Sequence, residues 1–338
     1  ADVAEEILRI YGFNAIPFPQ GMRVHMAQEA KVTPERIRHV ASEFLVGRGF
    51  HEILTNSLTK DSWTKDHPSI DGDKVVHVLN PLSQDLSVMR PHMIMGGLEA
   101  ISYNIKRRQQ HVPIFEWGRI YQHSNKGYQE AHQLAIWLCG NHPGPHWSMT
   151  HQPSPFASLK GVVEGLLSRM GIDHSTQDLT GSEGLLSHGI TYVHKGQRLV
   201  ELAWTSPHAM QAADVDQKVV VAICHWDEIQ ALARKQKPTY QAVPKHPSVT
   251  RDLALVVDDS LSFGDILQAV SSASIKQLTA TDLFDVYQGK NLPKGKLSYG
   301  IRMTFQDVNK TMKDKQVDAM MKRITDAIVN QCQAEVRQ

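Results

Sequence analysis

The sequence predicts an α+β fold in which most strands of the main sheet run antiparallel, and three observations support this prediction. Strand-like and helix-like segments alternate irregularly, so they do not follow the regular strand–helix–strand order of a parallel sheet. The apolar segments 190–193 and 199–204 flank the turn residues 194–197, which is the pattern of an antiparallel hairpin. From about residue 253 the elements follow the order βαββαβ, which is the ferredoxin-like split βαβ pattern.

Composition places the chain among ordinary globular proteins. Its 338 residues, of which 41% are hydrophobic and 21% charged, suffice for about two or three domains. The net charge is +1, so any surface that attracts nucleic acid has to be local. Cys139, Cys224 and Cys332 form no CxxC pair, which indicates a reducing compartment. Apolar runs such as 219–224 are far shorter than the roughly 20 residues of a membrane helix, so we expect a cytoplasmic protein without a membrane partner.

Two proline-containing stretches divide the chain into three expected parts. The opening segment already has apolar residues at helical spacing, so we expect a fragment of a longer protein that starts inside an element. Prolines and a glycine at 17–21 predict a first boundary near residue 20. A second linker is predicted at 233–247, where Lys, Gln and Pro are frequent. The expected parts are residues 1–20, 21–240 and 245–338.

Helices of the middle part have recognisable starts. Thr33 and Pro34 supply an N-cap and a first-turn proline, and the apolar residues that follow lie on one helical face until Gly47. Another helix is predicted after residue 155, where apolar residues recur at three and four positions. The other predicted elements are a helix at 93–107 and strands at 50–58, 74–79, 112–122, 133–139, 190–193, 199–204 and 219–225.

The last part has clear strand and capping signals. Ser262 followed by Asp265 is the signature of a capping box at a helix start. A turn rich in Gly, Pro and Lys at 289–295 separates two strands. The predicted strands are 253–257, 278–287, 297–305 and 334–337, with helices after Ser262 and over Val317 to Ile328.

Several short segments, spread over nearly the whole chain, carry a specific resemblance. They are Asp2–Ile7, Arg9–Phe13, Ile16–Pro17, Asn80–Ser83, Ser87–Pro91, Phe115–Arg119, Leu159–Gly161, Pro247–Ala254, Leu283–Tyr287 and Thr304–Asp307. Through them the chain resembles the C-terminal part of bacterial phenylalanyl-tRNA synthetase β subunits. The resemblance implies the end of a small DNA-binding-like domain at 1–20. It also implies a noncatalytic class II synthetase-like antiparallel-sheet core at 21–240 and a ferredoxin-fold anticodon-binding domain at 245–338.

The resemblance further implies a noncatalytic β subunit that scaffolds a catalytic α subunit and binds tRNA for the ATP-dependent charging of tRNA with phenylalanine. In this family two α and two β subunits form a heterotetramer, and ATP is bound by the α subunit. A working class II site needs a strand arginine beside an acidic residue and a later glycine-rich junction that ends in arginine. Residues 115–119 contain an acid and an arginine, but with the wrong neighbours for this strand arginine. Residues 200–237 contain no glycine-rich junction of this kind. We therefore expect the chain alone to be an inactive part of the ligase.

Other functions remain open at this stage. The main alternative is a free-standing RNA-binding or regulatory protein derived from a synthetase, and a copurifying subunit would distinguish the two. A self-sufficient ligase is a weaker alternative. No GxxxxGK[ST] loop is present, so a P-loop enzyme has no support. Cys139, His142, His146 and His151 match no standard zinc spacing, and we predict a solvated histidine-rich loop there.

Acidic residues at the start of the chain form a candidate Mg²⁺ site. Asp2, Glu5 and Glu6 match positions that the family uses for Mg²⁺, and carboxylates are suitable ligands for it. A fourth acidic position would lie upstream of Ala1, so the resemblance implies only a partial site here. The alternative is that these acids favour the positive end of the helix dipole.

Lysines concentrate at residues 290–315 and predict a tRNA-binding surface. The candidate residues are Arg251, Lys290, Lys294, Lys296, Arg302 and Lys310. Tyr287, Tyr299 and Phe305 lie close by in sequence, and exposed aromatic rings beside cations on a sheet can stack unpaired bases. The alternative is a solvated edge of the sheet, with some of these aromatic residues in the core.

Overall fold

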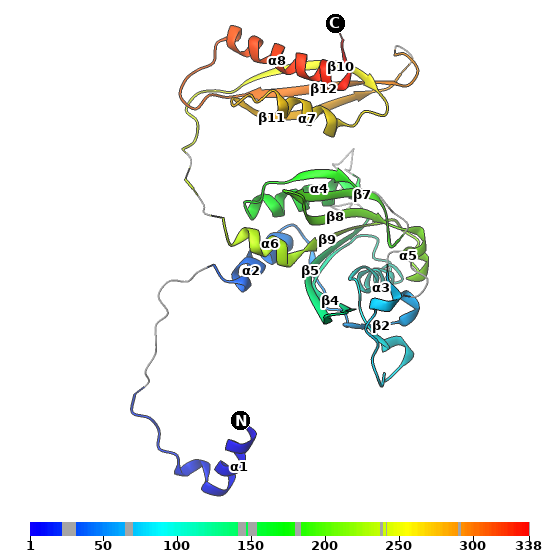
Figure 1. The fold of residues 1–338 in the computed structure, drawn as a ribbon, viewed down its shortest axis with the longest axis vertical. Coiled ribbons are helices and arrows are strands. Elements are labelled where there is room, and N and C mark those ends of the chain that lie inside the picture. The colour runs from blue at the N-terminus through cyan, green and yellow to red at the C-terminus, as the bar shows by residue number, and fades with distance from the viewer. Residues whose placement is uncertain are drawn as a thin grey trace. The chain divides into compact units, whose positions relative to one another are not determined.

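The computed structural model describes residues 1–21, 32–64, 70–140, 147, 154–179, 184–236, 239–240, 242–289 and 292–337. The chain divides into two compact units, unit 1 with residues 1–236 and unit 2 with residues 237–338 (Figure 1). His142, His146 and His151 of the predicted histidine-rich loop lie outside the described residues, and so does Lys290. None of the helices in the described ranges is long and apolar enough to cross a membrane.

Unit 1 is built on one large sheet that is antiparallel except for a single strand pair. The strand order is β1-β4-β5-β9-β8-β7-β6, and only β1 pairs in parallel, with β4. This arrangement confirms the predicted α+β class with a mainly antiparallel sheet. The strands are β1 (His51–Glu52), β4 (Val112–Ser124), β5 (Gly127–Cys139), β6 (Ser175–Asp178), β7 (Leu186–His194), β8 (Gln197–Thr205) and β9 (Val219–His225).

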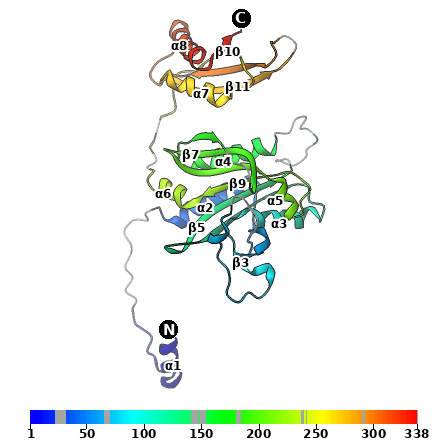
Figure 2. The ribbon, with the colours of Figure 1, turned by 45° about the vertical axis from the view of Figure 1, so that its right-hand side comes forward.

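Helices cover both faces of this sheet, so unit 1 has two cores (Figure 2). Successive side chains of a strand point to opposite faces. Along β5, Leu134, Ile136 and Leu138 therefore belong to one core, and Ala135 and Trp137 belong to the other. The first core includes α2 (Pro34–Val46), α4 (Pro155–Arg169) and α6 (Trp226–Ala233); the second includes α3 (Ile94–Ile105) and α5 (Pro207–Ala212).

A buried ion pair joins the irregular segment, which lies between β1 and α3, to the large sheet. Arg90 Nη1 lies 2.9 Å from Glu116 Oε1 on β4, and the two side chains are only 7% and 0% exposed. The Arg90 Nε–H donates to the backbone oxygen of Arg119 at 2.8 Å, and the Thr55 hydroxyl donates to Glu116 Oε2 at 2.7 Å. Gly118 leaves the space for this network, because a Cβ there would overlap the Arg90 guanidinium.

Two predicted strands in this irregular segment are wrong in extent. Instead of one strand at 50–58, the structure has β1 and β2 (Leu58–Thr59), which pairs with β3 (Val88–Met89). The interruption follows from Glu116, which accepts the backbone N–H of Thr55 at 3.2 Å. The predicted strand at 74–79 is reduced to one bridge at His77, because a 3-10 helix capped by Asp71 occupies Gly72–Lys74.

The opening helix α1 (Asp2–Tyr11) forms as predicted, yet none of its residues is buried. Val3, Ile7 and Ile10 are 77%, 62% and 91% exposed. Because these three residues recur at helical spacing, α1 carries an apolar stripe that packs against no core among the described residues.

Unit 2 has the predicted βαββαβ order around a four-stranded sheet, β11-β12-β10-β13 (Figure 1). Its helices and alternate strand residues share one core. Ser262 and Asp265 form the predicted capping box, in which each side chain bonds the other residue's backbone N–H. The elements are β10 (Val249–Asp258), α7 (Phe263–Ser272), β11 (Leu278–Tyr287), β12 (Lys296–Phe305), α8 (Asp314–Cys332) and β13 (Glu335–Val336).

Replacing Arg90 with Met should destabilise unit 1 by about 3–5 kcal/mol, because it leaves the Glu116 carboxylate buried without its partner. All six tryptophans lie before residue 237, so tryptophan fluorescence during urea unfolding reports unit 1 alone. Lys74→Ala is the control, since its ion pair with Asp71 is about half exposed. It should cost less than about 1 kcal/mol. Equal effects of the two variants would contradict the importance of the buried pair.

Candidate nucleic-acid interface

The sheet of unit 2 has one face toward its helices and one open face. Along β12, Tyr299, Ile301, Met303 and Phe305 enter the core, so the alternate residues point to the open face. The predicted stacking role is therefore wrong for two residues, because Tyr299 is 8% exposed and Phe305 is 0% exposed. Tyr299 is also fixed by its hydroxyl, which donates to the Leu261 carbonyl at 3.1 Å.

Tyr287 and Phe284 are the aromatic residues of the open face. Tyr287 lies in register with Ser298 and is 37% exposed. Phe284, which the sequence reasoning missed, is 54% exposed. With Leu283 packed against the core, strict alternation would have sent Tyr287 to the core side as well, but the register shifts between Leu283 and Asp285, and this irregularity places Phe284 and Tyr287 on the same face.

Gly300 is the sequence feature that could have indicated the position of Phe284. A Cβ there would lie 3.0 Å from Phe284 Cζ and 3.0 Å from Asp285 Cβ. A glycine inside a strand often marks a close approach of another group. Here it leaves room for the Phe284 ring beside the central strand.

Each exposed ring has an arginine over it. Arg302 Cζ lies 5.0 Å from the centroid of Phe284, and Arg337 Cζ lies 5.9 Å from the centroid of Tyr287. Such positions allow cation–π attraction. Two aromatic–guanidinium pairs therefore lie on the same face of the sheet.

Three of the predicted tRNA-binding cations are held by acidic partners. Arg302 makes a bidentate pair with Asp252, with N···O distances of 2.8 and 2.7 Å. Its hydrogen bonds hold the pKa of the Asp252 carboxyl below the usual range. Lys296 pairs with Glu335 at 2.8 Å, which raises the pKa of that lysine.

Arg251 lies on the other face of the sheet from Arg302. It is in register with the core residue Met303, and it contacts Asp314 at 2.6 Å and Asp318 at 3.6 Å on α8. The hydrogen bond that Arg251 donates to Asp314 is the main reason that the pKa of Arg251 is raised. The predicted basic residues therefore do not form one continuous surface.

Lys294 and Lys310 are exposed, and neither has an ion pair within the described part of the chain. Lys294 lies in the turn between β11 and β12, and Lys310 lies in the segment before α8. These two ammonium groups are available to an external anion.

The open face carries more acids than cations among the described residues. Its cations are Lys296, Arg302 and Arg337, and its acids are Asp252, Asp258, Asp282, Asp285 and Glu335. Such a face repels phosphates, while its rings and carboxylates suit the flat surfaces and N–H edges of unpaired bases.

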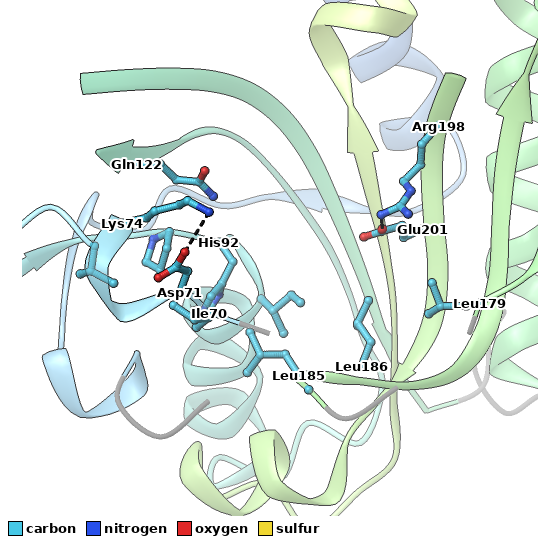
Figure 3. A pocket seen from close by; sticks show the side chains of 14 residues that line it. Ile70, Asp71, Lys74, His92, Gln122, Leu179, Leu185, Leu186, Arg198 and Glu201 are labelled. Atoms are coloured by element: carbon cyan, nitrogen blue, oxygen red, sulfur yellow. Dashed lines mark hydrogen bonds and ion pairs between the residues drawn. The ribbon is translucent and has the colours of Figure 1, made fainter. Parts of the chain in front are cut away.

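Unit 1 contains a cavity of about 450 Å³ beside its sheet (Figure 3). Asp71 and Lys74 pair at 2.8 Å on one wall, and Arg198 and Glu201 pair at 2.6 Å on another. Apolar residues, including Leu185, separate the two ion pairs. These charged groups therefore neutralise each other in pairs.

The predicted Mg²⁺ residues do not form a metal-binding group. Glu6 is paired with Arg9 at 3.0 Å, and Asp2 and Glu5 remain in the exposed first turn of α1. No group of three or more His, Cys, Asp or Glu residues suited to a metal occurs in the described ranges. The residues present therefore do not fit a Mg²⁺ site by themselves.

Comparisons with known proteins agree with this architecture. The family described as "Phenylalanyl tRNA synthetase beta chain CLM domain" matches residues 19–226, and the "Ferredoxin-fold anticodon binding domain" matches 244–337. The phenylalanine–tRNA ligase β subunits of Porphyromonas gingivalis and Bacteroides fragilis are 35% and 33% identical over 99% of this chain. A pyrrolysyl-tRNA synthetase structure from Desulfitobacterium hafniense covers 68% of this chain and 74% of its own at 14% identity and a TM-score of 0.45, too low to support an inference.

The chain spans about 42% of the length of these two β subunits. The two family matches follow each other along the chain, and each lies within one compact unit. The chain therefore belongs to the phenylalanyl-tRNA synthetase β chain family.

Proposed function

We propose that this chain acts as part of a noncatalytic β subunit of phenylalanine–tRNA ligase in the cytoplasm. Unit 1 scaffolds a catalytic α subunit within a heterotetramer of two α and two β subunits, and unit 2 holds the anticodon region of tRNA. The α subunit binds ATP and catalyses the charging of tRNA with phenylalanine. The observation that carries the proposal is the open face of unit 2, where Phe284 and Tyr287 are exposed in a domain of the anticodon-binding family.

The open face supports recognition of unpaired bases. Phe284 and Tyr287 supply flat apolar surfaces, and the sheet keeps their backbone positions fixed. Asp285 lies between them in sequence, in register with Gly300, and has no ion pair within the described residues. A free carboxylate there accepts hydrogen bonds from the N–H groups on the edge of a stacked base.

The junction between β9 and α6, in the main sheet of unit 1, supports the noncatalytic part of this proposal. Strand β9 leads directly into α6, whose first residues are Trp226 and Asp227. Trp226 is buried, and Asp227 accepts the backbone N–H of His132 at 2.9 Å. The residues of α6 include neither glycine nor arginine, so this junction supplies no clamp for ATP phosphates. ATP therefore belongs to the α subunit in this proposal.

Exposed apolar residues of unit 1 support a partner surface. Leu54, Leu79 and Leu82 are 89%, 94% and 98% exposed. Leu79 and Leu82 lie in the loop between Val78 and Ser87, whose backbone groups bond at 2.9 Å. A subunit that covers such leucines removes apolar surface from water. A free-standing RNA-binding protein would leave them exposed, so sizing after coexpression with an α subunit separates the two functions.

This chain alone should show no phenylalanine-dependent exchange between ATP and pyrophosphate, because it lacks the phosphate-clamping arginines. Addition of an α subunit from the same source, under conditions where the two assemble, should provide the activity. Exchange by the purified chain without an α subunit would refute the noncatalytic assignment.

Phe284→Ala and Tyr287→Ala should each weaken tRNA binding by the assembled enzyme by about 1–3 kcal/mol, which is typical for loss of one stacked base. The Tyr103→Ala variant is the control, because Tyr103 is 57% exposed but lies on α3 of unit 1. Binding is measured by titration with the phenylalanine tRNA. Unchanged binding in both unit 2 variants would refute the stacking face.

Lys294→Ala should lower the salt slope of tRNA binding by roughly 0.7 to 0.9, the change for one lost phosphate contact. Lys296→Ala should change the slope less, since Lys296 is already paired with Glu335. Adenylate formation by the assembled enzyme should be unaffected in both. Equal slopes for the parent and Lys294→Ala would show that this turn does not contact tRNA.

A further inference from the structure

Arg302 lies in a row of alternating charges across the open face of unit 2. It occupies the central strand β12, with Asp252 directly opposite on β10 and Asp282 directly opposite on β11. Successive partners in a row like this lie on the same face of a sheet. The single guanidinium is therefore flanked by two carboxylates, and the row as a whole is negative.

Asp252 fixes the plane of the guanidinium. Arg302 donates from Nε to Asp252 Oδ1 at 2.8 Å and from Nη2 to Oδ2 at 2.7 Å. Two parallel hydrogen bonds between planar groups restrict rotation of both side chains. A phosphate that bound Arg302 would have to break these bonds or approach two carboxylates, and both are unfavourable.

The fixed guanidinium lies next to the Phe284 ring, with 5.0 Å between Arg302 Cζ and the ring centroid. Gly300 provides the room for the ring on this side, since a Cβ there would come within 3.0 Å of Phe284 Cζ. Guanidinium planes and aromatic rings both stack on nucleobases. Arg302 and Phe284 together therefore offer a larger stacking surface than the ring alone.

We infer that Asp252 is a positioning residue that makes Arg302 part of the base-stacking surface and keeps it from acting as a phosphate ligand. The inference rests on the proposed function of the open face. Its consequence is that tRNA contact on this face depends on stacking and responds weakly to salt. Phosphate contacts come instead from cations outside the row, such as Lys294.

The decisive variant is Asp252→Ala in the assembled enzyme, with binding of the phenylalanine tRNA measured across a salt series. Release of Arg302 should steepen the salt slope by roughly 0.7, because one new phosphate contact to a single-stranded region becomes available. Binding at high salt, where phosphate contacts count least, should weaken by about two- to fivefold, as expected for loss of an exposed cation–π contact.

Two further variants separate positioning from charge. Asp252→Glu keeps a carboxylate that can pair with Arg302, so it should restore the parent's salt slope. Arg302→Lys keeps a charge that can pair with Asp252 but loses the planar fork, so it should weaken binding at high salt without steepening the salt slope. Asp314→Ala is the matched control, because it removes one carboxylate partner of an arginine, Arg251, on the helix side of the same sheet while Asp318 remains. Its slope should equal that of the parent.

The outcomes distinguish this inference from the proposed function. If Phe284→Ala and Tyr287→Ala bind tRNA like the parent, the open face does not bind tRNA and both proposals fail. If those two variants weaken binding while Asp252→Ala leaves the salt slope unchanged or lowers it, the stacking face stands and the role of Asp252 is refuted. Circular dichroism of each variant confirms that the fold is retained.

Discussion

The buried pair of Arg90 and Glu116 is the interaction on which the irregular part of unit 1 depends. Among its described residues, the segment between β1 and α3 has two short strands and three 3-10 helices, so few backbone ladders hold that part of it. Glu116 reaches it from a long, fully paired strand and bonds both Arg90 and Thr55. Because the pair is buried, loss of either partner leaves an uncompensated charge, and the segment cannot shift without that cost.

This network also gives the family signature in unit 1 a structural role. Residues 87–91 and 115–119 carried much of the resemblance, and they contain Arg90, Glu116 and Gly118. Gly118 makes room for the guanidinium, and Trp117 donates to Ser42 on the opposite face at 2.8 Å. An arginine and an acid on neighbouring segments resemble parts of a phosphate clamp. Here they bond each other inside the protein, so they are not available to a nucleotide.

Much of the fold could be predicted because its signals are local. Hairpins, capped helices and the βαββαβ order depend on residues a few positions apart, and the structure confirms them. The strand at 50–58 failed because Glu116, about sixty residues later, takes the Thr55 N–H. In unit 2, alternation with Leu253 and Leu255 could have placed Arg251 on the helix side. The phase shift at Phe284 and the ion-pair partners of the cations depend on neighbouring strands, which sequence order alone does not show.

The distribution of charge in unit 2 separates two kinds of contact with RNA. Lys294 lies at the end of the sheet without an ion pair in the described residues, so it can attract phosphate from a distance and in a salt-dependent way. The rings of the open face act only at contact, and their neighbouring acids oppose the phosphate backbone. A strand of RNA is therefore favoured only when its bases turn toward the sheet and its phosphates turn away. On the proposed RNA-binding face, charge would thus select an orientation of RNA, even though the chain's net charge is only +1.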